Sequence, residues 1–305
     1  MTQAQHPRQR PVFALGLRVI AALMIATMFA LGKMASDSGV SLPEIMFWRQ
    51  LVSLPLLLGY LVFTSGLHRL RTERIASHAM RAGLGLTGMF FNFASVTLLP
   101  LAESTTLGFT APLFAVILTA AVLHERVGPW RWTAVLFGFV GVLVIAQPGS
   151  VPIDPLGATA GLLAGMFNAI ISFQIRDLGR TEEPISVVFY FGLFGSLAMA
   201  LLLPFYATGH SLYQFGLLIA MGLVGTLGQL LMTTALRLGA VASVIVMDYT
   251  ALIWAALFGW AIWDHLPPAT TWLGAPLIIT AGVVIAWREH RLSRTKLPVS
   301  GIESD

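Results

Sequence analysis

The feature that most constrains this chain is a succession of ten apolar stretches, each long enough to cross a lipid bilayer. A spanning helix needs about 20 mostly apolar residues, because in hydrocarbon every backbone N–H and C=O must pair within the segment. The connections between the stretches are short and contain turn formers such as Gly128-Pro129 and Pro267-Pro268. The stretches cover residues 11–33, 44–64, 80–99, 102–123, 131–147, 156–175, 185–206, 212–236, 240–263 and 270–287.

The composition excludes an ordinary soluble domain. Only 10% of the 305 residues are charged and 56% are hydrophobic, whereas soluble domains carry about 25% charged residues. The 18 Lys and Arg residues exceed the 14 Asp and Glu residues, which gives a net charge of +4. In a membrane protein such a surplus is explained by topology rather than by nucleic-acid binding. We therefore predict an all-α integral membrane protein with ten transmembrane helices and no nucleic-acid partner.

The first apolar stretch follows Arg8 and Arg10, as a secretory signal would. It is long, however, contains Arg18, ends at Lys33 and has no convincing small-residue cleavage site. We therefore interpret it as the first membrane span.

The distribution of Lys and Arg predicts the orientation. If the N-terminus is cytoplasmic, the inner segments hold fifteen of the eighteen basic residues, and the outer loops hold only Lys33. Arg18 and Arg49 lie within spans. We predict a multi-pass protein of the cell inner membrane with both termini in the cytoplasm. The inner basic residues are Arg8, Arg10, Arg69, Arg71, Arg74, Arg81, Arg126, Arg131, Arg176, Arg180, Arg237, Arg288, Arg291, Arg294 and Lys296.

The ten stretches form two halves with matching lengths and punctuation. The segments Pro100 to Glu125 and Gly239 to Asp264 both end on an acidic residue, and each is followed by a Pro-containing turn and a Gly-rich helix. Because five is odd, the second half must enter the membrane from the opposite side. This predicts inverted repeats around a central cavity, with a substrate site near the midplane. The predicted parts are a cytoplasmic tail (1–10), a first five-helix repeat (11–147), a second repeat (156–288) and a second cytoplasmic tail (289–305).

The sequence resembles the drug/metabolite transporter superfamily, and specifically its EamA-type members. The resemblance rests on the ten spans, on PEIMFWR at residues 43–49, on LPLAESTTLGFTAPLFAVILTAAVLHERV at 99–127 and on WTAVLFGFVGVLVIAQPG at 132–149. It covers nearly the whole chain and implies a basket of ten helices in which the third, fourth, eighth and ninth helices and their neighbours face the substrate. Members of the family move small metabolites, amino acids and drugs, commonly outward. The second half departs from the first in having Asp264-His265 in place of Glu125-Arg126, and Tyr190 where the alignment places Arg49.

Few charged side chains lie within the spans, where an ionised group costs about 2.5–3.5 kcal/mol on insertion scales. We interpret Arg18 as an anchor that snorkels to the cytoplasmic surface. Lys33, Glu44 and Glu103 fall at the outer ends of their helices and are predicted to reach headgroups or water.

Arg49 and Asp248 are the two charges predicted at depth. With 1.5 Å of rise per residue, Arg49 lies about 8 Å from the outer end of its helix and Asp248 about 12 Å from the inner end of its own. Two interpretations remain open. The pair forms a salt bridge that locks two helices, or it lines the cavity, where Arg49 receives a carboxylate and Asp248 an amine or a proton. The second interpretation includes proton coupling as an option.

Uncharged side chains complete the predicted substrate-binding set. They lie on the helices that the resemblance assigns to the cavity, and the alternative for each is packing or interhelical hydrogen bonding. Pro112 interrupts the fourth helix and is the candidate for a functional kink, with simple packing as its alternative. The set consists of Asn92, Phe109, Thr110, Asn168, Gln229 and Tyr249, together with Arg49 and Asp248.

The sequence lacks the motifs expected for catalysis, metal binding or ATP hydrolysis. The chain has no cysteine and no Walker-type GxxxxGK[ST] loop, and its seven histidines fall in tails, loops or span ends. No nucleophile elbow is present. We predict no enzyme, no metal, no cofactor and no ATP-driven pump.

The predicted function is secondary transport of a small organic metabolite by alternating access, most simply export. One deep cation, one deep anion and aromatic neighbours favour zwitterionic amino-acid-like, aromatic or cationic solutes. Phosphorylated polyanions are disfavoured, because Arg49 is the only cation predicted at depth. The alternatives are uptake or exchange by the same fold, or a lipid carrier or membrane scaffold. The sequence does not distinguish a monomer from a homodimer.

Overall fold

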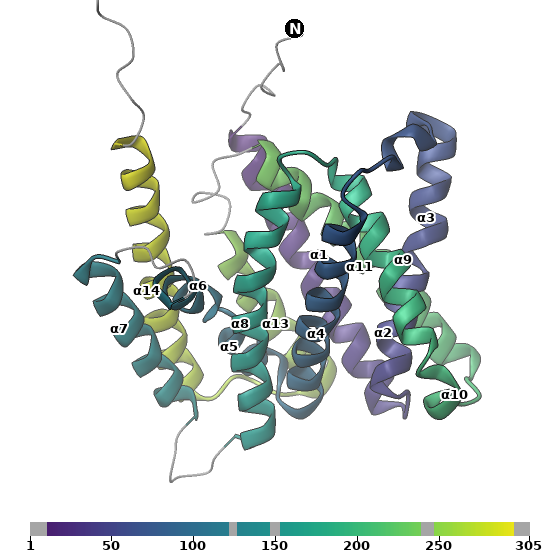
Figure 1. Cartoon of the computed structure of the whole chain (residues 1–305). Helices are drawn as coiled ribbons and strands as arrows, with labels where there is room; N and C mark the ends of the chain where they lie inside the picture. Colours follow the sequence, from purple (N-terminus) through teal and green to yellow (C-terminus); the bar gives the residue numbers. More distant parts are fainter. Residues whose placement is uncertain (1–10, 122–126, 147–152, 239–246, 296–305) are drawn as a thin grey trace, which may run out of the picture.

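The computed structural model describes residues 11–121, 127–146, 153–238 and 247–295, and every regular element in these ranges is a helix (Figure 1). Some predicted features lie outside these ranges, among them the tail 1–10, the Glu125-Arg126 turn and the start of the predicted span 240–263. The first half contains α1 (Pro11–Asp37), α2 (Leu42–Leu51), α3 (Ser53–Tyr60), the π-helix η1 (Leu61–Ser65), the 3₁₀ helix η2 (Leu67–Leu70), α4 (Ile75–Leu98), α5 (Leu101–Gly108), α6 (Ala111–Ala121) and α7 (Pro129–Ala146). The second half contains α8 (Pro155–Leu178), α9 (Pro184–Ala200), α10 (Leu203–Tyr206), α11 (Leu212–Leu238), the 3₁₀ helix η3 (Met247–Thr250), α13 (Ala251–Trp263) and α14 (Ala269–Thr295).

Each of the predicted apolar stretches contains helix, and the chain is a multi-pass membrane protein. Six helical segments are long and apolar enough to cross a bilayer, and two shorter apolar helices cover Pro129–Ile145 and Pro184–Ala200. Large apolar side chains such as Phe63, Phe205 and Leu212 lie exposed on the outer surface, where lipid would cover them. The final helix continues to Thr295, past the predicted boundary at residue 288. The six segments are Val12–Asp37, Leu42–Thr64, Leu101–Ala121, Pro155–Ile175, Leu212–Ala235 and Ala269–Trp287.

Two of the spanning segments are interrupted by proline in the same way. A proline within a helix has no N–H to donate to the carbonyl four residues earlier. Pro55 therefore leaves the carbonyl of Leu51 without its helical donor, and α2 ends at Leu51. Pro112 stands in the same relation to Gly108, where α5 ends. The predicted break at Pro112 is thus present, and the polypeptide turns at Phe109 and Thr110 before α6 begins.

The two halves pack intimately against each other. The most extensive helix pairings are α1 with α11, α4 with α8 and α7 with α14, and each joins the first half to the second. Glycines permit this approach: a Cβ at Gly141 of α7 would lie 2.7 Å from the carbonyl oxygen of Gly274 of α14. In Figure 1 the start of α1 and the end of α14 lie at the same end of the molecule, which we name the terminal end.

Candidate functional site

Arg18 and Asp248 form an ion pair between the halves. Nε and Nη2 of Arg18 in α1 both donate to the carboxylate of Asp248 in η3, and Nη1 of Arg18 lies 3.4 Å from the carbonyl oxygen of Met232 in α11. The Arg18 side chain is 7% exposed and that of Asp248 is 35% exposed. The prediction that Arg18 snorkels to the surface is therefore wrong. Asp248 attracts it inward, because a bidentate carboxylate matches the guanidinium fork.

Arg49 lies apart from that pair. Its guanidinium donates to Oε1 of Gln50 and lies 5.3 Å from the centre of the Phe191 ring of α9. Nε2 of Gln50 in turn donates to the carbonyl oxygen of Phe191, over 3.2 Å. Arg49 is 8% exposed, and its Nε has no hydrogen-bond partner. Of the two interpretations of Arg49 with Asp248, a direct salt bridge is excluded in this conformation.

A second deep arginine approaches the same aromatic ring. The guanidinium carbon of Arg81 in α4 lies 4.5 Å from the centre of the Phe191 ring, and the residue is only 3% exposed. Its side chain extends along α4 over Gly85, where a Cβ would collide with Nη1. Nε and Nη1 of Arg81 have no partner. Arg81 was predicted among the basic residues of the inner segments, at the start of the span 80–99, and the expectation that Arg49 is the only deep cation is wrong.

Two further pairs of predicted residues meet across the halves. Nδ2 of Asn92 in α4 donates to Oδ1 of Asn168 in α8, over 3.3 Å, and also to the carbonyl oxygen of Gly88. The rings of Phe109 and Tyr249 contact each other edge to face with centroids 4.9 Å apart. The Tyr249 hydroxyl is buried against Gly282 of α14 and has no hydrogen-bond partner within the described ranges.

The remaining predicted residues make local contacts. The Thr110 hydroxyl donates to the carbonyl oxygen of Leu107, over 2.6 Å, which closes the end of α5. Gln229 is half-buried in α11, and its backbone carbonyl accepts from Thr233. Pro112 lies in the first turn of α6, where a missing N–H costs nothing. The roles of these residues in substrate binding stay predictions.

Glu44 and Glu103, at the end opposite the termini, are buried, contrary to prediction. Glu44 and Glu103 are each 1% exposed. Glu44 pairs with His210 at 2.9 Å, and Glu103 accepts from Thr271 and lies 3.8 Å from His265. Each pair joins the first half of the chain to the second.

The amine of Lys33 at the same end caps a neighbouring helix instead of reaching headgroups or water. Its Nζ donates to the carbonyl oxygens of Val96 and Leu99, over 2.6 and 3.1 Å. These carbonyls belong to the last turn of α4 and to the residue after it. The cation therefore satisfies backbone acceptors that the helix itself leaves free.

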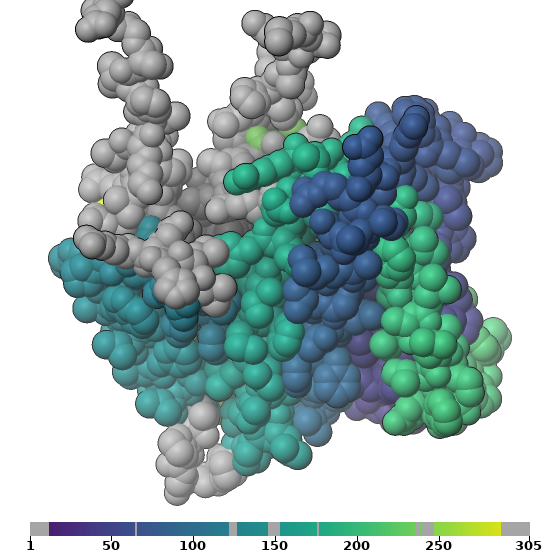
Figure 2. Space-filling model, viewed as in Figure 1, coloured from purple at the N-terminus to yellow at the C-terminus, as the bar shows by residue number. Residues whose placement is uncertain are grey.

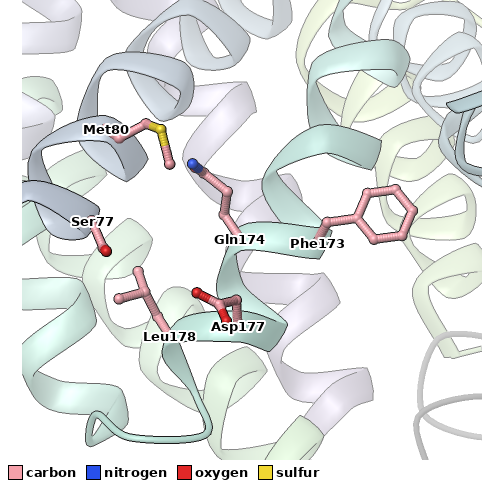
Figure 3. A pocket seen from close by; sticks show the side chains of 6 residues that line it. All are labelled: Ser77, Met80, Phe173, Gln174, Asp177 and Leu178. Atoms are coloured by element: carbon pink, nitrogen blue, oxygen red, sulfur yellow. The ribbon is translucent and has the colours of Figure 1, made fainter. Parts of the chain in front are cut away.

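Two open clefts lie at the surface of the described part of the molecule. One, of about 190 Å³, lies between α4 and α8 near the terminal end, in the face on which the side chains of α8, α4 and α9 lie against one another (Figures 2 and 3). The other, of about 420 Å³, is an apolar groove between the α2–α3 segment and α11. Neither is lined by a residue of the predicted set. The first is lined by Ser77, Met80, Phe173, Gln174, Asp177 and Leu178, and the second by Trp48, Leu51, Val52, Pro55, Leu56, Ile219 and Leu223.

The described residues contain no cluster of three His, Cys, Asp or Glu side chains that could hold a metal ion. His6 and His124 lie outside the described residues. His78 and His210 are engaged by carboxylates instead, at 3.3 Å from Glu182 and 2.9 Å from Glu44.

Sequence reasoning missed Arg81, Phe191 and Gln50. A signal for Arg81 was present, since it follows Arg74 and His78 at helical spacing on one face of α4. Arg74 pairs with Asp177 and His78 with Glu182, whereas Arg81 lies deeper and has no carboxylate within 4.0 Å among the described residues.

Known proteins resemble this chain over nearly its whole length. The profile of the EamA-like transporter family matches residues 12–147 and again residues 155–287. The pseudopaline exporter CntI of Pseudomonas aeruginosa is 31% identical over 281 residues, which are 92% of this chain and 95% of that protein. A riboflavin transporter of Vibrio cholerae is 27% identical, with 96% of this chain and 98% of that protein covered. An S-adenosylmethionine uptake transporter of Rickettsia bellii is 26% identical, with 83% and 87% covered.

A solved crystal structure shares the fold. It superimposes with a TM-score of 0.63 and covers 93% of this chain and 99% of its own, at 19% sequence identity. With both halves matched by one family profile and named transporters aligned from end to end, the chain is a small-molecule transporter. It belongs to the EamA-like transporter family, within the drug/metabolite transporter superfamily.

Proposed function

We propose that this protein is a secondary transporter that moves a small, carboxylate-bearing metabolite across the cell inner membrane by alternating access. One observation carries the proposal: the deep polar and aromatic contacts join the two halves. Arg18 meets Asp248, Asn92 meets Asn168, and Arg49 meets Phe191. In transporters built from repeats, the substrate site lies at the repeat interface and the halves rock about it.

The pattern of helix pairing supports ten crossings in two inverted repeats. α1 and α11 are the first and eighth predicted spans, and they pack together. Exchanging the two halves converts this pair into the sixth and third spans, α8 and α4, which also pack together. The pairings of α7 with α14, α2 with α9 and α5 with α13 map onto themselves. Such self-mapping pairs are what a twofold axis between the halves would produce.

The charge distribution supports a cargo with a carboxylate. Arg18 already neutralises Asp248. An amine of the cargo would therefore gain less from binding Asp248 than from binding an unpaired carboxylate. Arg49 has only the neutral amide of Gln50 as its acceptor, and a carboxylate would be a stronger one. A zwitterionic, amino-acid-like solute fits, with aromatic rings available for stacking, whereas a purely cationic solute would be repelled by Arg49.

Export is the direction that we propose, with both termini cytoplasmic. The relative named as an exporter supports it, although another relative is named for uptake. The common location of the start of α1 and the end of α14 supports an even number of crossings (Figure 1). Topology reporters fused to each end should both report the cytoplasm.

A flux assay in proteoliposomes tests the proposal. Purified protein should release preloaded zwitterionic solute in response to a gradient, and empty liposomes should not. The chain has no cysteine, so a cross-link can be introduced selectively. Ser38 and Gln214 hydrogen bond across the halves at the end opposite the termini, over 2.8 Å. The double variant Ser38→Cys, Gln214→Cys, bridged by a short bismaleimide, should lose flux, while each single variant treated with the same reagent should keep it.

A lipid carrier remains the second candidate, because the groove between the α2–α3 segment and α11 is lined only by apolar side chains such as Trp48 and Ile219. Transfer of labelled lipid between leaflets without solute flux would favour this alternative. Solute flux that is blocked by the cross-link would exclude it.

A further inference from the structure

Three general properties of the arginine side chain bear on the pair formed by Arg49 and Arg81. Its guanidinium stays protonated in proteins, it is costly to bury without a counter-charge, and it binds carboxylates through paired N–H donors. Both residues are more than nine-tenths buried, and both contact one aromatic ring, that of Phe191. Two like charges therefore face a single small region of the interior.

The described residues supply no counter-charge there. Among the described residues, neither arginine has a carboxylate within 4.0 Å, and Glu182, which precedes α9, is engaged by His78. Nε of Arg49 and Nε and Nη1 of Arg81 are buried donors without an acceptor. By contrast, the other deep arginine, Arg18, has both oxygens of Asp248.

Neighbouring elements make room for these guanidinium groups. Gly85 leaves space for Arg81 and for the Phe191 ring, whose Cε2 would lie 2.6 Å from an added Cβ. Gly225 of α11 faces Nε of Arg49, which would lie 3.6 Å from a Cβ there. The region thus draws on α2, α4, α9 and α11, and so on both halves of the chain.

We propose that Arg49 and Arg81 together form the anion subsite of the transporter, and that its cargo carries two acidic groups, as a dicarboxylate does. Two cations beside one ring match two carboxylates separated by a short carbon chain better than they match one. The charge of the cargo would offset the repulsion between the guanidinium groups. This inference rests on the proposed transport function, and it replaces the expectation that a single deep cation disfavours multiply charged anions.

Equilibrium binding tests the subsite separately from transport. Purified wild-type protein in detergent, at constant low ionic strength, is titrated with succinate, glutamate, glutamine and inorganic phosphate while its Tm is followed, because a ligand that binds the folded state raises Tm. Succinate and glutamate should raise Tm at lower concentrations than glutamine. A larger response to phosphate than to succinate would overturn the dicarboxylate assignment, and equal responses to glutamate and glutamine would overturn the anion subsite.

Variants assign the effect to the two arginines. Arg49→Gln and Arg81→Gln should each weaken succinate binding at least about tenfold, the loss of one charge-assisted contact. The matched control, Arg74→Gln, removes the same charge from the exposed end of α4 and should bind as the wild type does. If either Gln variant fails to fold, Arg81→Lys and Gly85→Ala serve instead. The first keeps the charge without the fork and the second displaces the guanidinium, so unchanged binding in both would overturn the proposal.

Transport measurements separate the two failures. If the protein moves glutamine and glutamate equally well and Arg81→Gln moves both normally, the protein is a transporter and the subsite is wrong. If dicarboxylates bind through Arg49 and Arg81 but no solute crosses the liposome membrane, the subsite stands and the transport function is wrong.

Discussion

Two places deep in this molecule hold buried arginines, and they differ in whether a carboxylate pairs with the guanidinium. At the first, Arg18 of one half has Asp248 of the other half as a two-point partner. At the second, Arg49 and Arg81 share the face of Phe191, and no acid among the residues that the structure describes pairs with them. The first site is complete without a ligand, whereas the second is complete only with an anion.

This difference separates a structural tie from a binding site. A buried pair that loses one partner leaves an uncompensated charge, so its removal is costly. A buried charge that has no partner already bears that cost, so its removal relieves the fold. Substitutions at the two sites should therefore change stability with opposite signs, although the residues removed are of the same type.

The largest effect is expected for Arg18→Gln. The substitution leaves the Asp248 carboxylate partly buried without its cation, and we expect a loss of about 2–3 kcal/mol, below the 3–5 kcal/mol of a fully buried pair because Asp248 is partly exposed. Unfolding of the purified variant in detergent measures it. The double variant Arg18→Gln, Asp248→Asn should recover most of the loss, and additive losses would show that the two residues do not interact.

Asp248→Asn alone should cost about 2 kcal/mol, because Arg18 keeps an amide oxygen as acceptor but its guanidinium, the more buried partner, loses its counter-charge. The same variant tests proton coupling. If Asp248 takes up a proton when the pair opens during transport, the variant should lose the pH dependence of flux in proteoliposomes. Undiminished flux with an unchanged pH profile would exclude Asp248 as the coupling group.

Arg81→Met should raise stability by about 1 kcal/mol when no multivalent anion is present, because it removes a buried charge and its repulsion with Arg49. Part of the gain is offset by the lost contact with the Phe191 ring. Thermal unfolding with and without succinate measures the net change in stability. A variant less stable than the wild type in the absence of anion would mean that Arg81 is a structural residue, and the contrast between the two sites would fail.

The smallest effect is expected for Asn92→Ala. Its hydrogen bond to Asn168 also joins the halves, but interhelical hydrogen bonds in membrane proteins contribute about 0.6 kcal/mol on average. The variant should unfold almost as the wild type does. If Asn92 instead contacts the cargo, flux should fall while stability stays, which would extend the binding site toward α8.

Much of the architecture could be predicted from the chain because its signals are local. The spans follow from runs of apolar residues, and the breaks at Leu51 and Gly108 follow from prolines four positions later. The two halves could be recognised from their matching lengths, and the family from short motifs such as PEIMFWR. None of this requires knowledge of which helix lies beside which.

The candidate site was predicted less completely. Arg49, Asp248, Asn92 and Tyr249 were identified as unusual, since polar groups within apolar helices stand out. Their partners were not, and Arg81 was counted among the inner basic residues because basic residues near an inner helix end obey the positive-inside rule. Arginine has a long, flexible stem, so its charged group lies about a helical turn from its Cα, in a direction that the packing chooses.

The sequence by itself thus determined that this is a helical membrane protein of two similar halves with few buried charges. Only the tertiary structure decided that Arg18 takes Asp248 and that Arg49 and Arg81 remain together without an acid. The reason is physical: hydrophobicity and helix geometry act along the chain, whereas an ion pair depends on which faces meet across two halves, and that is fixed by the packing of all the helices together.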